Sequence, residues 1–201
     1  MDWITESRLI TLRHHKTCSC DPWNKLYVDR KNKSCNDESK RCIIITMTIP
    51  VTIRRNDPTA LPRFAALNAE WIEALHFLEE SDKLMVAHPE IYTENGNHVF
   101  SAHIEGQVAG ACALKKHDDG RYELTKMAVD TSFRGNGVGQ QLITAVEAYA
   151  KTELGLDTLF LLSNTKNEAA LRLYTRNGWT INHEGPHPVY DRANIGMEKH
   201  L

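Results

Sequence analysis

The stretch Arg134-Gly135-Asn136-Gly137-Val138-Gly139 is the most informative part of this 201-residue chain. It follows a strand-like run, Tyr122 to Val129, and opens an amphipathic helical pattern. Three glycines in five positions let the backbone turn tightly and approach a ligand without interference from Cβ atoms. N–H groups at the start of a helix then point outward at the positive end of the helix dipole. The sequence therefore predicts a loop that binds a pyrophosphate.

Two common phosphate-binding loops do not fit this stretch. A nucleoside-triphosphate loop would place a lysine and a hydroxyl residue after its glycines, whereas this chain has Gln140 and Gln141. A dinucleotide-binding fingerprint would need a third glycine three residues after the second, and that position is Leu142. The flanking segments decide whose pyrophosphate is bound.

Those segments resemble the GNAT superfamily of N-acetyltransferases. Its acetyl-coenzyme A loop reads Gln/Arg-x-x-Gly-x-Gly/Ala, which Arg134, Gly137 and Gly139 match in order. The run Glu123 to Val129 resembles the fourth strand of that family. The run Asn167 to Trp179 resembles its Asn-x-x-Ala-x-x-x-Tyr-x-x-x-Gly-Phe/Trp helix. The resemblance implies an acyl-CoA N-acyltransferase fold, with acetyl-CoA as co-substrate and an amine-bearing acceptor.

The bulk composition excludes several classes of function. Hydrophobic residues make up 41% of the chain and charged residues 25%, which is ordinary for a soluble globular protein. A net charge of −2 gives no electrostatic argument for a nucleic-acid partner. No apolar run approaches the ~20 residues that span a bilayer, and the first residues lack the pattern of a signal peptide. We expect a cytoplasmic protein with no nucleic-acid or membrane partner; a homodimer is compatible with the sequence.

Residues 1–46 differ in composition from the rest of the chain. They carry nine Lys/Arg against six Asp/Glu and contain four of the five cysteines. Thiolates and imidazoles are zinc ligands, but a Cys-x-Cys pair with single distant partners is not the spacing of a zinc finger or ribbon. We therefore predict no metal site. Residues 1–46 are interpreted as a disordered extension or an upstream start, and residues 47–201 as the N-acetyltransferase domain.

The periodicity from Met47 onward predicts an α/β fold, with a mixed, mostly antiparallel sheet flanked by helices. Strands are predicted over residues 48–54, 98–104, 108–115, 122–129, 158–162, 179–183 and 193–200. Helices are predicted over residues 62–76 and 77–84, from the glycine loop to a C-cap at Gly155, and from an N-cap at Asn167 to Gly178. The strand over residues 158–162 is a continuous apolar run, which is typical of burial on both faces.

Acetyl transfer to an amine needs a group that removes a proton. A lysine-like amine has a pKa of ~10.4 and is protonated at pH 7, so a carboxylate within hydrogen-bond reach is required, directly or through water. The resemblance gives this catalytic role to Glu123. The alternative is a solvated strand carboxylate or a cross-strand partner of Lys126 or Arg121. Carboxylates on the second predicted helix are further candidates, although a solvated helix face explains them as well: Glu79, Glu80 and Asp82.

The helix motif supplies two further candidates. The family uses a tyrosine at the position of Tyr174 to donate a proton to the leaving sulfur, so Tyr174 is the second predicted catalytic residue. Its alternative role is a core aromatic, because Tyr174 lies on the apolar side with Ala170 and Leu171. Asn167 matches the asparagine that binds pantetheine, although helix capping alone would also explain it.

The resemblance also assigns backbone groups to cofactor binding. In the family the fourth strand bulges and splays from its neighbour, so that pantetheine pairs with it as an extra strand. This implies that Met127, Ala128 and Val129 bind through their backbone, with an N–H of Met127 or Ala128 facing the thioester oxygen. The loop Arg134 to Gly139 would hold the pyrophosphate, with a charge-assisted contact from Arg134.

The acceptor end is less clearly marked. His183 and His187 lie in or near the last loop and are candidates for the acceptor pocket. Two other functions remain open beside acetyl transfer to a small molecule, peptide or protein. A non-catalytic acetyl-CoA sensor would keep the loop without the chemistry, and an acyltransferase could use a longer acyl chain.

Overall fold

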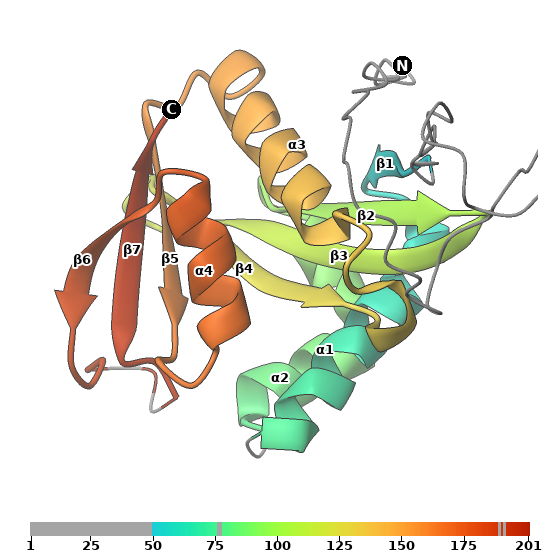
Figure 1. The fold of residues 1–201 in the computed structure, drawn as a ribbon, viewed down its shortest axis with the longest axis horizontal. Helices are drawn as coiled ribbons and strands as arrows, with labels where there is room; N and C mark the ends of the chain where they lie inside the picture. The colour runs from blue at the N-terminus through green and yellow to red at the C-terminus, as the bar shows by residue number, and fades with distance from the viewer. Residues whose placement is uncertain (1–49, 76–77, 189, 191) are drawn as a thin grey trace, which may run out of the picture. The chain divides into compact units, whose positions relative to one another are not determined.

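The computed structural model describes residues 50–75, 78–188, 190 and 192–201. Within these residues, seven strands form one sheet in the order β1-β2-β3-β4-β5-β7-β6. Neighbouring strands are antiparallel except for β4 and β5, which are parallel. Helices cover the sheet (Figure 1), so the predicted mixed, mostly antiparallel α/β fold is confirmed. The predicted extension over residues 1–46 and its cysteines lie outside the described residues.

Most predicted elements are found close to their expected bounds. The strands are β1 (Thr52–Arg55), β2 (His98–Ile104), β3 (Gln107–Lys116), β4 (Tyr122–Val129), β5 (Thr158–Ser163), β6 (Thr180–Glu184) and β7 (Ile195–His200). The α-helices are α1 (Leu61–Leu75), α2 (Glu80–Ala87), α3 (Val138–Thr152) and α4 (Glu168–Arg176). Short 3-10 turns precede α1, follow α2 and precede the glycine loop: Pro58–Ala60, Pro89–Thr93 and Thr131–Phe133.

Three local predictions were wrong. The strand β5 is not buried on both faces: Leu159 and Leu161 are buried but Thr158 is exposed, because only one face packs on the core. The helix α3 ends at Thr152, and Gly155, with φ 64°, lies beyond its cap. The helix α2 begins later than predicted because Asp82 accepts a hydrogen bond from the backbone N–H of Glu79, 3.0 Å away, as a capping residue does.

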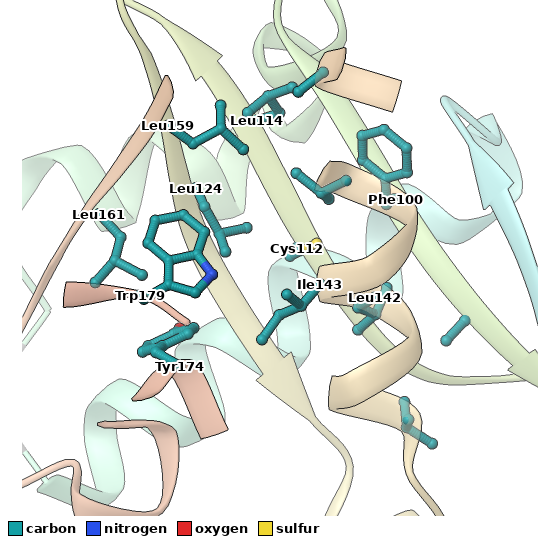
Figure 2. Close-up of a cluster of buried hydrophobic side chains, with 14 of the residues drawn as sticks. Phe100, Cys112, Leu114, Leu124, Leu142, Ile143, Leu159, Leu161, Tyr174 and Trp179 are labelled. Carbon is teal, nitrogen blue, oxygen red and sulfur yellow. The ribbon is translucent and has the colours of Figure 1, made fainter. Parts of the chain in front are cut away.

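The alternation of side chains along the strands divides the core between the two faces of the sheet. On one face, Phe100, Cys112 and Leu124 pack against α3, and Trp179 and Tyr174 close the cluster from the end of α4 (Figure 2). On the other face, the neighbouring positions Val99, Ala111 and Ala113 pack with Leu61, Phe64 and Met85 from the first two helices. The two helical layers thereby hold β3 and β4 in the middle of the domain.

The helix α2 is attached to the sheet through a buried carboxylate. The side chain of Asp82 is fully buried, with Oδ1 2.5 Å from Nζ of Lys126 on β4. Its Oδ2 lies 2.5 Å from a terminal nitrogen of Arg192, in the segment before β7. The expectation of a solvated helix face is therefore wrong for Asp82, although it holds for Glu80, whose side chain is 89% exposed. Three segments that are distant in sequence meet at this one side chain.

Removal of the charge of Asp82 should destabilise the domain. In the Asp82→Asn variant, Lys126 and Arg192 lose their shared counter-ion in a mostly buried setting. Breaking such a network costs about 3–5 kcal/mol, so thermal unfolding should begin several degrees lower. Glu80→Gln is the matched control, because the exposed pair of Glu80 with Lys83 contributes little. Equal melting temperatures for the two variants would contradict this account.

The proposed domain boundary at Met47 remains a prediction. If residues 1–46 lie outside the domain, a chain that begins at Met47 should keep the melting temperature of the full chain. Calorimetry of the two chains tests this directly. A drop of several degrees on truncation would show that the cysteine-rich stretch stabilises the domain.

Candidate functional site

The pairing of β4 is irregular on both of its sides. Lys126 has a left-handed φ of 50°, and the register with β3 shifts between Ala111 and Ala113, which is the pattern of a β-bulge. On the other side, β4 pairs with β5 only through Glu123 and Phe160. The arrowheads of β4 and β5 point apart in Figure 1. The expected bulge and splay are both present, and among the described residues the edge of β4 beyond Glu123 has no strand partner on this side.

A pocket of about 220 Å³ lies at this opening. Four of the predicted site residues line it, although they come from different elements: Glu123 and Met127 from β4, and Asn167 and Tyr174 from the start and middle of α4. Further lining residues come from the first two helices, the turn after α2, β3 and the segment before β7: Asn68, Trp71, Glu79, Tyr92, Lys115, Tyr190 and Arg192. The fold therefore brings the fourth strand and the asparagine–tyrosine helix to one site.

Glu123 is buried, with 8% of its side chain exposed. Neither expected partner pairs with it: Arg121 pairs with Asp119, and Lys126 pairs with Asp82. Its partner is instead His117, whose Nε2 lies 2.8 Å from Oε2. This contact was not predicted from the sequence, because His117 belongs to the turn between β3 and β4 and no motif marks it.

Tyr174 is buried, and its hydroxyl group donates to the sulfur of Met127, with 3.7 Å between the oxygen and the sulfur. Burial raises the pKa of Tyr174 above its ordinary value, with a smaller contribution from Cys112. The hydroxyl therefore stays protonated at every pH at which the protein is ordinarily handled. A thioether is a weak acceptor, so the Tyr174 hydroxyl can donate its hydrogen bond instead to a stronger acceptor that enters the pocket.

Asn167 occupies the N-cap position of α4, but its side chain makes no capping hydrogen bond. The predicted N-cap position is therefore confirmed, but the side chain of Asn167 does not cap the helix. Its Nδ2 contacts Oγ of Ser163 at 3.5 Å, and its Oδ1 is buried without a hydrogen-bond partner. Buried polar atoms are normally paired. An unpaired amide oxygen beside the pocket fits an N–H donor of a ligand, such as an amide of pantetheine.

The glycine loop turns through two left-handed glycines into the start of α3. Gly135 and Gly137 have left-handed φ values of 83° and 75°, and a Cβ at either position would meet no atom within 4 Å. Gly137 is the N-cap of α3, and Gln141 is the first residue to donate back to it, at 3.0 Å. The N–H groups of the intervening residues 138–140 therefore have no acceptor in the helix. Arg134 is exposed beside them, with its Nε 3.4 Å from the carbonyl of Val129.

The third glycine of the motif has a packing role that the sequence did not predict. A Cβ at Gly139 would lie 2.9 Å from Cδ2 of Leu173 and 3.2 Å from Cε of Met127. The absence of a Cβ at Gly139 is therefore required where α3 crosses α4 and β4. A contact of its backbone N–H with a phosphate stays a prediction.

The acceptor side of the pocket contains a group of paired charges. Arg192 Nε lies 3.0 Å from Oε1 of Glu79, and the same guanidinium contacts Asp82. Within the described ranges, the candidates His183 and His187 are not among the residues that line this pocket, and their place at the acceptor site stays a prediction. His183 contacts the carbonyl of Gly185, whereas His187 stacks on Tyr190, which lines the pocket.

Metal and membrane features can be stated for the described part of the chain. Within it, no cluster of three or more His, Cys, Asp or Glu side chains has the arrangement of a metal site. None of the helices in these ranges has the length and apolar character needed to cross a bilayer.

Similarity to solved structures establishes the fold. A GNAT-family acetyltransferase from Staphylococcus aureus Mu50 has a TM-score of 0.66 and 21% identity, covering 76% of this chain and 99% of that one. A putative acetyltransferase from Salmonella typhimurium, solved with its cofactor acetyl-CoA, has a TM-score of 0.61 and 18% identity, with coverages of 76% and 94%. A ribosomal-protein-alanine N-acetyltransferase from Brucella melitensis has a TM-score of 0.61 and 23% identity, with coverages of 74% and 99%.

Sequence comparison gives the family. Uncharacterized N-acetyltransferases of Mycobacterium bovis and Mycobacterium tuberculosis are 30% identical over 93 residues, which is 46% of this chain and 59% of each relative. The match thus spans less than two thirds of the curated relatives. Residues 65–179 match the family described as Acetyltransferase (GNAT) family. Because this match covers more than half of the chain, the protein belongs to the acetyltransferase (GNAT) family.

Proposed function

We propose that the protein transfers an acetyl group from acetyl-CoA to a primary amine of a small molecule, peptide or protein. The observation that carries this proposal is the pocket between β4 and α4, which Glu123, Tyr174 and the unpaired oxygen of Asn167 share. The Salmonella neighbour, which is solved with acetyl-CoA, supports the choice of co-substrate.

The cofactor side follows from the loop and the open strand edge. The N–H groups at the start of α3 hold the pyrophosphate, and Arg134 adds a charge-assisted contact. The unpaired edge of β4 at Met127, Ala128 and Val129 offers backbone groups to pantetheine, and Asn167 Oδ1 accepts from one of its amides. Acetyl-CoA supplies the activated acyl group and the leaving thiolate, so the protein contributes positioning and proton handling.

The acceptor side needs a base, and Glu123 takes that role. Its carboxylate lines the pocket and accepts the proton that the ammonium group of the acceptor must lose before it can attack. Glu79 and Asp82 are less suited, because Arg192 and Lys126 already occupy their oxygens. An N–H of Met127 or Ala128 on the bulged strand stabilises the negative charge that develops on the thioester oxygen.

Tyr174 acts on the leaving sulfur. Because burial raises the pKa of its hydroxyl, the O–H remains available as a hydrogen-bond donor across the working pH range. Its present acceptor, the sulfur of Met127, is weak and is readily exchanged for a thiolate. The N–C bond forms first, and the C–S bond then breaks as Tyr174 gives its proton to the leaving sulfur. Glu123 holds the proton that the ammonium group lost, and Tyr174 regains a proton from the nitrogen of the new amide.

Acetyl-CoA binding should be lost when a negative charge is placed in the glycine loop. The Gly137→Asp variant adds a strained side chain at a φ of 75° and a charge that repels phosphate. Isothermal titration should detect no binding. Gly106→Asp is a matched control, because Gly106 also has a left-handed φ, 79°, with open space around it, but lies in the β2–β3 turn. Wild-type affinity in the Gly137→Asp variant would rule out this loop as the binding site.

Variants of Glu123 and Tyr174 should respond differently to pH. Glu123→Gln should lower turnover ~10²–10⁴-fold at neutral pH, which is the usual contribution of a general base. High pH should partly restore it, since the amine then loses its proton to solvent. Tyr174→Phe should lower turnover without a comparable recovery and should keep its affinity for acetyl-CoA.

This comparison needs an acceptor, which a turnover screen of amines with acetyl-CoA would supply. Thermal unfolding serves as the control for both variants, because each substitution keeps the size of the side chain. A Glu123→Gln variant with wild-type turnover at every pH would assign the base to water or another carboxylate.

A further inference from the structure

His117 lies behind Glu123 and is held in place from three sides. Its backbone N–H donates to the carbonyl of Arg121, 2.9 Å away, which closes the β3–β4 turn. Its ring packs at 5.2 Å, centroid to centroid, from the ring of Phe160 on β5. Its Nε2 lies 2.8 Å from Oε2 of Glu123. The imidazole is thus fixed by the turn, by β4 and by β5.

The chemistry of this contact determines which atom carries the hydrogen. When Glu123 acts as a base, its carboxylate is ionised and has only acceptors, so Nε2 of His117 is then the donor to Oε2. The contact with His117 uses Oε2 and not Oε1. Glu123 lines the pocket, whereas His117 does not. Oε2 is therefore held by His117 on the side away from the pocket, which leaves Oε1 to contact a ligand in the pocket.

We propose that His117 is the positioning residue of Glu123: its Nε2–H fixes the carboxylate so that Oε1 meets the acceptor amine. This inference rests on the proposed function. It follows the general requirement that a catalytic base be oriented by a further group. The alternative is a histidine that only closes the turn, and its contribution would then be independent of Glu123.

Two variants separate the donor of His117 from its bulk. His117→Gln keeps an N–H donor near the position of Nε2, whereas His117→Phe fills the space without a donor. With the full chain and an accepted amine, His117→Phe should lower kcat about 10-fold, part of the contribution of a general base. The KM for acetyl-CoA should not change. His117→Gln should restore most of kcat, which a merely space-filling role of the ring would not require.

A double-mutant cycle excludes a purely structural effect. In a Glu123→Gln background, His117→Phe should cause no further loss of kcat. An equal loss in both backgrounds, or a His117→Phe variant with wild-type kcat, would overturn the inference and leave the proposed function standing. If the wild-type protein binds acetyl-CoA but acetylates no amine, the proposed function fails, and the inference that rests on it fails too.

Discussion

The interrupted pairing between β4 and β5 is the constraint on which the rest of the site depends. Backbone N–H and C=O groups in a sheet are normally paired, yet here two central strands share a single residue pair. The bulge at Lys126 turns β4 away from β5. The left-handed backbone of Lys126 carries a conformational strain of order 1–3 kcal/mol, because the residue is not glycine. The opening that results is both the pocket and the unpaired edge.

The strained residue is held by the same charges that form the pocket wall. Lys126 is fixed by Asp82, and Asp82 also binds Arg192, so α2 and the segment before β7 are joined to the bulge. Glu79 completes the group, which gives two carboxylates and two cations. Such a balanced network can be buried without an isolated charge. It also leaves Glu123 as the pocket carboxylate whose recorded partner is a histidine and not a permanent cation.

Local patterns predicted the elements well, because periodicity and turn residues act over a few positions: β2 and β4 have the bounds that their alternation indicates. The motif likewise located Asn167 and Tyr174. The ion pairs of Asp82 could not be predicted from the sequence, because the partner residues lie 44 and 110 positions away. A charged residue on a short helix also usually faces solvent. The packing role of Gly139 was not predictable for a related reason: it depends on the crossing of α3 over Met127 and Leu173.

The features of the pocket divide into those that binding requires and those that chemistry requires. A sensor of acetyl-CoA would use the glycine loop, the open edge of β4 and the amide oxygen of Asn167. It would gain nothing from Glu123, whose carboxylate loses hydration in the interior and is compensated by one hydrogen bond from His117. Nor would it gain from a Tyr174 hydroxyl paired with a weak acceptor. A buried tyrosine with a raised pKa that lines a pocket together with a buried carboxylate is typical of catalytic sites. Their presence here, on the two sides of one pocket, favours an enzyme over a binding module.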